Sequence, residues 1–318
     1  MPLVSTPKNP VPLGANAGYL DVRKGIKVRY ASWQSALQQR GGTVCIFPGR
    51  NEYIENYFEV VGELRRRGFA VAIIDWRGQG GSTRLVRGSS GGHIRSFIDY
   101  EQDIHHFMKG VVLPDCPMPY YALAHSMSAP ILFNAATKRG CWFHRLITTA
   151  PMVELAGLPL PQEVCAGVAT GLSWMGLGKQ PVPGDPYVWP SDVFEGNPLT
   201  SDRERFYRNV EVLDAVPGLA AGPPTIGWLH AAFDAMSRLD GEKYAPKIRV
   251  PSLLVVAGDD KIVSNKAIEA LSSRLRAGTQ IVLRGARHEI LQERDSIREQ
   301  FWAAFDAFAP GVAVRKTA

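Results

Sequence analysis

Cysteines are few in this sequence, and long hydrophobic runs are absent. The cysteines are Cys45, Cys116, Cys141 and Cys165. They lack the paired C-x-x-C spacing of a zinc or redox site. Scattered cysteines of this kind are typical of reduced side chains that pack inside a cytoplasmic protein. No apolar stretch reaches the roughly 18 residues that a membrane-spanning helix requires, so we expect no membrane span.

The N-terminus lacks the basic and then apolar segments of a secretory signal, so a cytoplasmic protein is expected. Lys and Arg number 36 against 30 Asp and Glu, a net charge of +6 that is spread along the chain. Because the basic residues form no run, nucleic-acid binding is not indicated. The mild excess is compatible with a peripheral contact on the inner face of a membrane.

Short apolar runs alternate with amphipathic segments along much of the chain. A first pair of strands flanks Lys24 and Gly25, which predicts a hairpin. Further strands are expected at 43–49, 69–77, 120–126, 145–153, 250–258 and 279–285. Helices are expected at 53–68, 99–112, 265–277 and 296–308 and directly after residue 126. This alternation predicts an α/β fold, with a mostly parallel sheet and helices on both of its faces.

Two segments do not follow the alternation. Residues 1–18 are rich in proline and are expected to form a loosely attached N-terminal tail. Residues 154–240 are rich in Pro, Gly and Trp, with helical pieces and no convincing strand. That stretch is too long for an ordinary loop, so we expect an inserted, mainly helical cap. The α/β core would then comprise residues 19–153 and 241–310.

The stretch YALAHSMSAPIL has the pattern of a buried strand that runs into a helix, with Ser126 at the junction. Serine hydrolases place their nucleophile at such a turn, usually within G-x-S-x-G. Ala124 and Ser128 occupy the two glycine positions here. They are the smallest replacements available, and a β-carbon at a position with positive φ costs about 1 kcal/mol. The turn is therefore sterically feasible, although this motif alone is a weak signal.

Two further residue types follow Ser126 in the order that α/β-hydrolases use, Ser, then Asp or Glu, then His. Asp259 and Asp260 end one predicted strand, and His288 follows the next. We choose Asp260 as the acid that orients the histidine, with Asp259 as the alternative. A backbone N–H in FPGRNE, after the first core strand, can pair with the N–H of Met127 to bind an oxyanion.

Five blocks of this sequence together resemble the lysophospholipase L2 and monoacylglycerol lipase group of α/β-hydrolases: FPGRNEYIENYF, GFAVAIIDWRGQGGS, AHSMSAP, AGDDKIVS and ARHEIL. The resemblance covers most of the chain. It implies Ser126 as nucleophile, Asp260 as orienting acid and His288 as base, with the backbone N–H groups of Arg50 and Met127 as the oxyanion hole. The chain departs from the group at the turn itself, where the usual run is G-H-S-M-G-G.

Other motifs are not met. The run HEILQE places Gln292 where a zinc helix needs its second histidine, and GLGKQ lacks the glycine and hydroxyl residue of a phosphate loop. The histidines outside the motifs above are interpreted as structural or solvated. We expect neither a metal nor an organic cofactor.

Residues 164–178 carry no charge. Two interpretations stay open for this stretch: a lid helix that packs on the core, or a surface that lines an acyl-chain pocket or touches lipid. Under the second interpretation, Leu172 and Met175 are candidate substrate-binding residues.

The sequence predicts a serine hydrolase that cleaves the carboxylic ester of a monoacyl lipid, a lysophospholipid or a monoacylglycerol, through an acyl-enzyme on Ser126. The substrate class comes from the resemblance, because the fold alone does not determine it. Two alternatives stay open. One is a general carboxylesterase for small soluble esters, and the other is a catalytically silent protein that binds acyl ligands.

Overall fold

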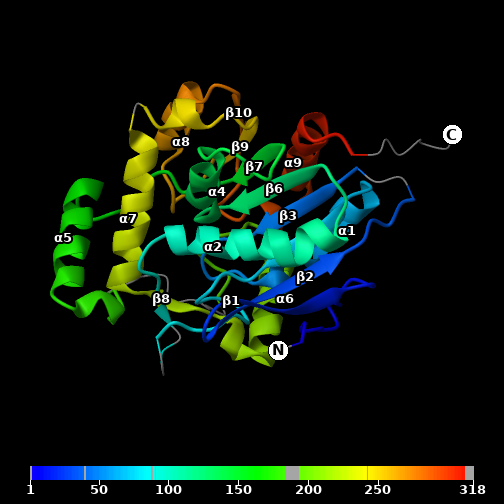
Figure 1. The fold of residues 1–318 in the computed structure, drawn as a ribbon, viewed down its shortest axis with the longest axis horizontal. Helices are drawn as coiled ribbons and strands as arrows, with labels where there is room; N and C mark the ends of the chain where they lie inside the picture. Colours follow the sequence, from blue (N-terminus) through cyan, green and yellow to red (C-terminus); the bar gives the residue numbers. More distant parts are fainter. Residues whose placement is uncertain are drawn as a thin grey trace.

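The computed structural model describes residues 2–38, 41–86, 89, 91–182, 193–241 and 243–311. In this part of the chain an eight-stranded sheet has the order β1-β2-β4-β3-β6-β7-β9-β10 (Figure 1). The strands are β1 (Asn16–Arg23), β2 (Ile26–Trp33), β3 (Thr43–Phe47), β4 (Ala70–Ile74), β6 (Tyr120–His125), β7 (Arg145–Thr149), β9 (Ser252–Ala257) and β10 (Gly278–Leu283). β1 and β2 pair antiparallel, as do β2 and β4, and the remaining pairs are parallel. The predicted α/β fold is confirmed.

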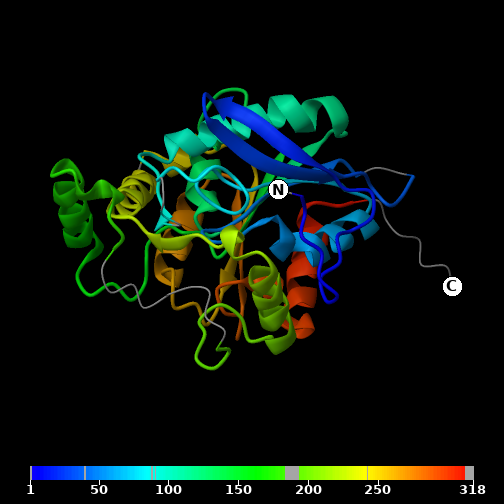
Figure 2. The same cartoon turned by 90° about the horizontal axis from the view of Figure 1, so that it is seen from below.

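Helices cover both faces of this sheet. Their bounds are α1 (Phe58–Arg66), α2 (Ile98–Phe107), α3 (Leu113–Asp115), α4 (Ser128–Ala136), α5 (Gln162–Trp174), α6 (Arg203–Ala215), α7 (Ile226–Asp240), α8 (Asn265–Arg274) and α9 (Asp295–Phe308). Figure 2 shows α2 on one side of the sheet and α1 and α9 on the other. Every residue of β3, β4, β6 and β9 is buried, as expected for parallel strands with a helix layer on each face.

The strands end earlier than the sequence pattern predicts. β3 ends at Phe47 and β4 at Ile74, two and three residues before the expected ends. The apolar residues that follow them stay buried but leave the ladder and turn over the carboxyl edge of the sheet. Since β3 and β4 are neighbours in the sheet, the loops that follow them lie side by side at this edge. The predicted hairpin turn is present, and Gly25 has a φ of 78° there.

The N-terminal segment is held more firmly than expected. The backbone N–H of Val4 donates to the buried carboxylate of Glu55 at 3.0 Å, and the side-chain amide of Asn9 donates to the Glu55 carbonyl at 2.9 Å. β1 begins at Asn16, within the predicted tail. The expectation of a loosely attached tail over residues 1–18 is therefore corrected. The buried Glu55 accepts hydrogen bonds from donors of this segment and so holds it against the core.

Among the described residues between β7 and β9, the α-helices are α5, α6 and α7. The segment also holds one short strand that the sequence pattern did not predict, β8 (Gly222–Pro224), which pairs with β5 (Gly91–Gly92). Both views show α7 between α5 and the sheet (Figures 1 and 2). None of the helices that the structure describes is both long and apolar enough to cross a membrane.

Candidate active site

Ser126 lies in the sharp turn between β6 and α4, and its φ of 49° is in the left-handed region that glycine favours. Backbone hydrogen bonds lock the turn on both sides. The N–H of Ser126 donates to Thr149 on the neighbouring β7 at 3.0 Å, and its carbonyl accepts from Ala129 at 3.0 Å and Met152 at 3.1 Å. The strain at Ser126 is thus held by the sheet and by the first turn of α4.

The predicted nucleophile, base and acid lie in one hydrogen-bonded line. His288 Nε2 is 2.9 Å from Ser126 Oγ, and His288 Nδ1 is 2.8 Å from Asp260 Oδ2. Each of the three residues follows the carboxyl end of a parallel strand: β6, β9 or β10. An imidazole between a hydroxyl and a carboxylate is the arrangement that activates a serine for acyl transfer.

The structure brings Asp260, and not Asp259, to the imidazole. The Asp260 side chain is fully buried, and its second oxygen accepts from the backbone N–H groups of Ile262 at 2.8 Å and Val263 at 3.1 Å. Burial alone would raise the pKa of Asp260, but His288 and these two donors outweigh it and lower the pKa below the ordinary value of 3.8. Asp259 is exposed. Asp260 is therefore ionised when the imidazole needs a partner.

Both altered positions of the turn are accommodated. Ala124 is 1% exposed within β6 and pairs with Phe47 of β3 and Thr148 of β7. Ser128 is fully buried at the start of α4, and its hydroxyl donates to the carbonyl of Pro48. Neither β-carbon displaces Ser126 from its hydrogen-bonding distance to His288.

The loop after β3, which carries Arg50, is held on both sides of that residue. The N–H of Gly49 donates to Glu52, and the N–H of Asn51 donates to Gln79. The Arg50 side chain reaches β8, where it donates to Gly222 at 2.6 Å. A loop with this many fixed neighbours can present its amides to a reacting oxygen without rearranging.

Met127, the other predicted contributor of an oxyanion N–H, is the residue just before α4 and is fully buried. The side-chain amide of Gln79 donates to its sulfur at 3.4 Å. Since Gln79 also accepts from Asn51, this one side chain contacts both segments that flank the predicted oxyanion hole.

Sequence reasoning missed Glu52 and His125. Glu52 accepts from Gly49 and, at 2.6 Å, from the hydroxyl of Tyr57, and one of its oxygens is 3.9 Å from His125 Nε2. The His125 ring centroid is 4.9 Å from that of His288. Burial lowers the pKa of His125, as does the neighbouring His288, so this ring is neutral near pH 7. A carboxylate five positions after the buried strand β3 was the available signal for Glu52.

Glycine is required at position 49. A β-carbon there would lie 2.7 Å from His125 Cδ2 and 2.9 Å from Glu52 Oε2. The loop therefore passes against the His125 imidazole at a distance that only glycine permits.

The predicted substrate residues lie outside this cluster. Leu172 is half-buried on α5, and Met175, just after that helix, is 68% exposed. Because α7 lies between α5 and the sheet, the structure does not bring them to Ser126 (Figure 1). Their contact with a substrate stays a prediction.

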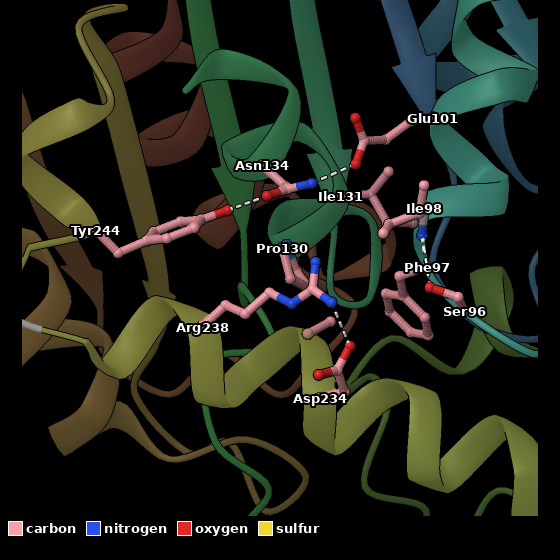
Figure 3. Close-up of a pocket in the computed structure, with 11 residues that line it drawn as sticks. Ser96, Phe97, Ile98, Glu101, Pro130, Ile131, Asn134, Asp234, Arg238 and Tyr244 are labelled. Atoms are coloured by element: carbon pink, nitrogen blue, oxygen red, sulfur yellow. Dashed lines mark hydrogen bonds and ion pairs between the residues drawn. The ribbon is translucent and has the colours of Figure 1, made fainter. Parts of the chain in front are cut away.

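Two cavities lie elsewhere in the described part of the chain, and none of the three aligned residues lines either of them. Figure 3 shows the one between α2, α4 and α7, where Tyr244 donates to Asn134 and Asn134 donates to Glu101. Its volume of about 10 Å³ suits one water molecule. The other, of about 450 Å³, is lined largely by exposed residues of α2 and of the segment after α4. No group of metal-ligating side chains was found among the described residues.

Known proteins are similar to this chain over most of its length. A family model described as serine aminopeptidase, S33, matches residues 38–295. Lysophospholipase L2 of Escherichia coli K12 is 30% identical over 86% of this chain and 81% of its own length. A probable lysophospholipase L2 of Haemophilus influenzae is 27% identical over 91% and 90%. Among solved structures, a soluble variant of monoglyceride lipase from Saccharomyces cerevisiae, in complex with a substrate analogue, aligns with a TM-score of 0.74 and 18% identity over 94% of this chain and 96% of its own.

Proposed function

Since this chain belongs to the serine aminopeptidase S33 family of α/β-hydrolases and is a carboxylic ester hydrolase, we propose that it cleaves the ester of a monoacyl lipid through an acyl-enzyme on Ser126. One observation carries the proposal: His288 lies 2.9 Å from Ser126 Oγ and 2.8 Å from Asp260. The lysophospholipase relatives, similar over most of their length, support a lysophospholipid or a monoacylglycerol as the substrate.

The reaction proceeds in two steps. His288 Nε2 takes the proton of the Ser126 hydroxyl as its oxygen attacks the ester carbonyl, and the backbone N–H groups of Arg50 and Met127 bind the oxyanion. The same imidazole then protonates the leaving alcohol. Water activated by His288 attacks the acyl-enzyme and releases the fatty acid. Throughout, Asp260 holds the imidazole in the tautomer that leaves Nε2 free to accept a proton.

Residues 154–240 form the cap in this proposal, and α5 supplies the contact with the acyl chain through Leu172 and Met175. Support comes from exposed apolar side chains on α5 and just after it: Val164 is 47% exposed, Val168 55% and Met175 68%. Exposed apolar surface on a helix suits both a long acyl chain and contact with a membrane surface. We therefore include peripheral membrane contact through α5 in the proposal.

Fatty acid release from a lysophospholipid, measured beside hydrolysis of a short-chain ester, tests this function. Wild type should release fatty acid, and Ser126→Ala should abolish release while the protein stays folded. Ser273→Ala is the matched control, because that hydroxyl is exposed on α8 and bonds only within its own helix, to the Ala270 carbonyl.

The two alternatives give different results. A general carboxylesterase would hydrolyse the short ester and leave the lysophospholipid intact. A silent acyl-binding protein would hydrolyse neither while remaining folded. Either result contradicts the proposed substrate, and the second also contradicts the proposed mechanism.

A further inference from the structure

Ser128 replaces the second glycine of the nucleophile turn, and its hydroxyl is part of a closed polar triangle. The hydroxyl donates to the carbonyl of Pro48, and the indole N–H of Trp76 lies 2.9 Å from both Ser128 Oγ and the Pro48 oxygen. Ser128 is 0% exposed and Trp76 is 1% exposed. A hydroxyl in so dry a place needs both a donor and an acceptor, and this one has them.

The three members of the triangle follow three adjacent strands. Trp76 follows β4, Pro48 follows β3 and Ser128 follows β6, and these strands are neighbours in the sheet. The indole is fixed by its own packing: its ring centroid is 5.6 Å from that of Phe47 in a stacked arrangement and 5.0 Å from that of Tyr100. A rigid donor therefore sets where the other two members lie.

The triangle joins the two segments that carry the proposed oxyanion N–H groups. Pro48 is two residues before Arg50, and Ser128 directly follows Met127. Donors in an oxyanion hole act only when both lie about 2.7 to 3.1 Å from the developing charge. A hydrogen bond between their neighbours fixes the distance between the two backbone segments, and with it the width of the hole.

We propose that Ser128 and Trp76 are positioning residues that set the spacing of the Arg50 and Met127 amides. In this turn the serine is thus a functional replacement of glycine, and its hydroxyl matters as much as its small size. The inference rests on the proposed function of Ser126.

The test compares Ser128→Ala, which keeps the β-carbon, with Ser128→Gly, which restores the usual glycine. Both variants lose the hydroxyl, so kcat for a short-chain ester should fall about tenfold in each, with KM unchanged. The inhibition constant of a trifluoromethyl ketone, whose adduct carries the oxyanion, should rise by the same factor. Trp76→Phe keeps an aromatic ring without the N–H and should change both quantities in the same direction.

Ser252→Ala is the matched control. That hydroxyl is also buried and bonded to a carbonyl, Val250 at 2.9 Å, but it lies at the opposite end of the sheet, at the start of β9. It should lower the melting temperature about as much as Ser128→Ala and leave kcat and the inhibition constant unchanged.

Two results would overturn the inference while wild type is active. One is a Ser128→Ala variant with unchanged kcat and inhibition constant, and the other is a Ser128→Gly variant with wild-type activity, which would make position 128 a matter of size alone. If Ser128→Ala does not fold, Trp76→Phe decides by the same readouts. A folded but inactive wild type contradicts the proposed function itself, so the two failures are distinguishable.

Discussion

The carboxyl edge of the sheet and helix α5, part of the proposed cap, differ in how many of their side chains are buried against other segments. At the sheet edge, Ser128 and Gln79 are nearly or fully buried, and each contacts two other segments. In α5, by contrast, Ala169 is the single buried residue among thirteen. The first region is built to hold atoms in fixed positions, and the second presents apolar surface outward.

This difference assigns the two tasks of the proposed enzyme to two regions. Acyl transfer needs donors and a base that are already in place, because reorganising them during the reaction costs rate. Selection of a long apolar chain needs apolar surface, which can be adjusted without disturbing the chemistry. Changes at the sheet edge should therefore alter kcat for every ester, whereas changes in α5 should alter the preference among esters.

The largest expected effect comes from the acid that orients His288. Asp260→Asn should lower kcat by about 10³- to 10⁴-fold, because an amide in this position favours the wrong tautomer of the imidazole. Initial rates with short and long esters should fall together. Asp259→Asn, at the exposed neighbour, should keep activity near that of wild type, and a loss there equal to that of Asp260→Asn would reverse the assignment.

Stability should follow the same contrast. Arg29 is buried between Glu55 and Asp75, which it bonds at 2.7 Å each. Arg29→Met leaves two buried carboxylates without a cation and should destabilise the fold by about 3–5 kcal/mol in urea titrations.

Arg238→Met is the matched change in the proposed cap. Arg238 pairs with Asp234 one turn away on α7 and is 39% exposed. Loss of this ion pair should lower the free energy of unfolding by less than about 0.5 kcal/mol. A similar fall in the free energy of unfolding for Arg29→Met and Arg238→Met would contradict the expected contrast in stability.

A selective effect is expected from α5. Leu172→Asp combined with Met175→Asp should reduce long-chain ester hydrolysis at least about tenfold and spare short-chain hydrolysis, because each added charge must be desolvated against an acyl chain. Met118→Asp is the control, since Met118 is 65% exposed on the core, close to the 68% of Met175. Equal losses for both chain lengths would contradict an acyl-contacting role for this helix.

The smallest effect concerns pH. Glu59 on α1 accepts from Arg205 at 2.7 Å and from Arg208 at 2.6 Å, both on α6, and so ties α6 to a helix that covers the sheet. Burial would raise the pKa of Glu59, but these guanidinium groups and Arg298 lower it below the ordinary value of 4.5. A lowered folded-state pKa stabilises the fold above the unfolded-state value, and that contribution is lost as the pH falls through the folded-state value.

Glu59→Gln should therefore lower the melting temperature most near pH 7, and the difference from wild type should shrink below about pH 4.5. Glu269→Gln, at an exposed position on α8, should show no such trend. A Glu59→Gln difference that grows as the pH falls would contradict the ion-pair explanation.

Much of the arrangement was accessible from the sequence. Ser126, Asp260 and His288 each follow a run of strand-forming residues, and parallel strands bring their carboxyl ends to one edge, so chain order alone predicted their proximity. The fold class and the resemblance to lysophospholipase L2 were both confirmed. The nucleophilic role of Ser126 stays a prediction.

Other contacts depend on packing between distant segments and left no periodic signal. Glu52 meets His125 only because the loop after β3 passes against the end of β6. The buried Glu55 that holds the N-terminal segment was likewise invisible, since a glutamate within an amphipathic helix pattern is normally solvated. The exposure of Met175 depends on where α7 places α5, which no local pattern determines.

Reaction with a fluorophosphonate, followed by intact-protein and peptide mass spectrometry, tests most directly whether this turn holds an activated serine. We predict one adduct per chain, located in the peptide that contains Ser126, and no adduct on Ser126→Ala. A folded wild type that stays unmodified, or an adduct on a different serine, would contradict the account.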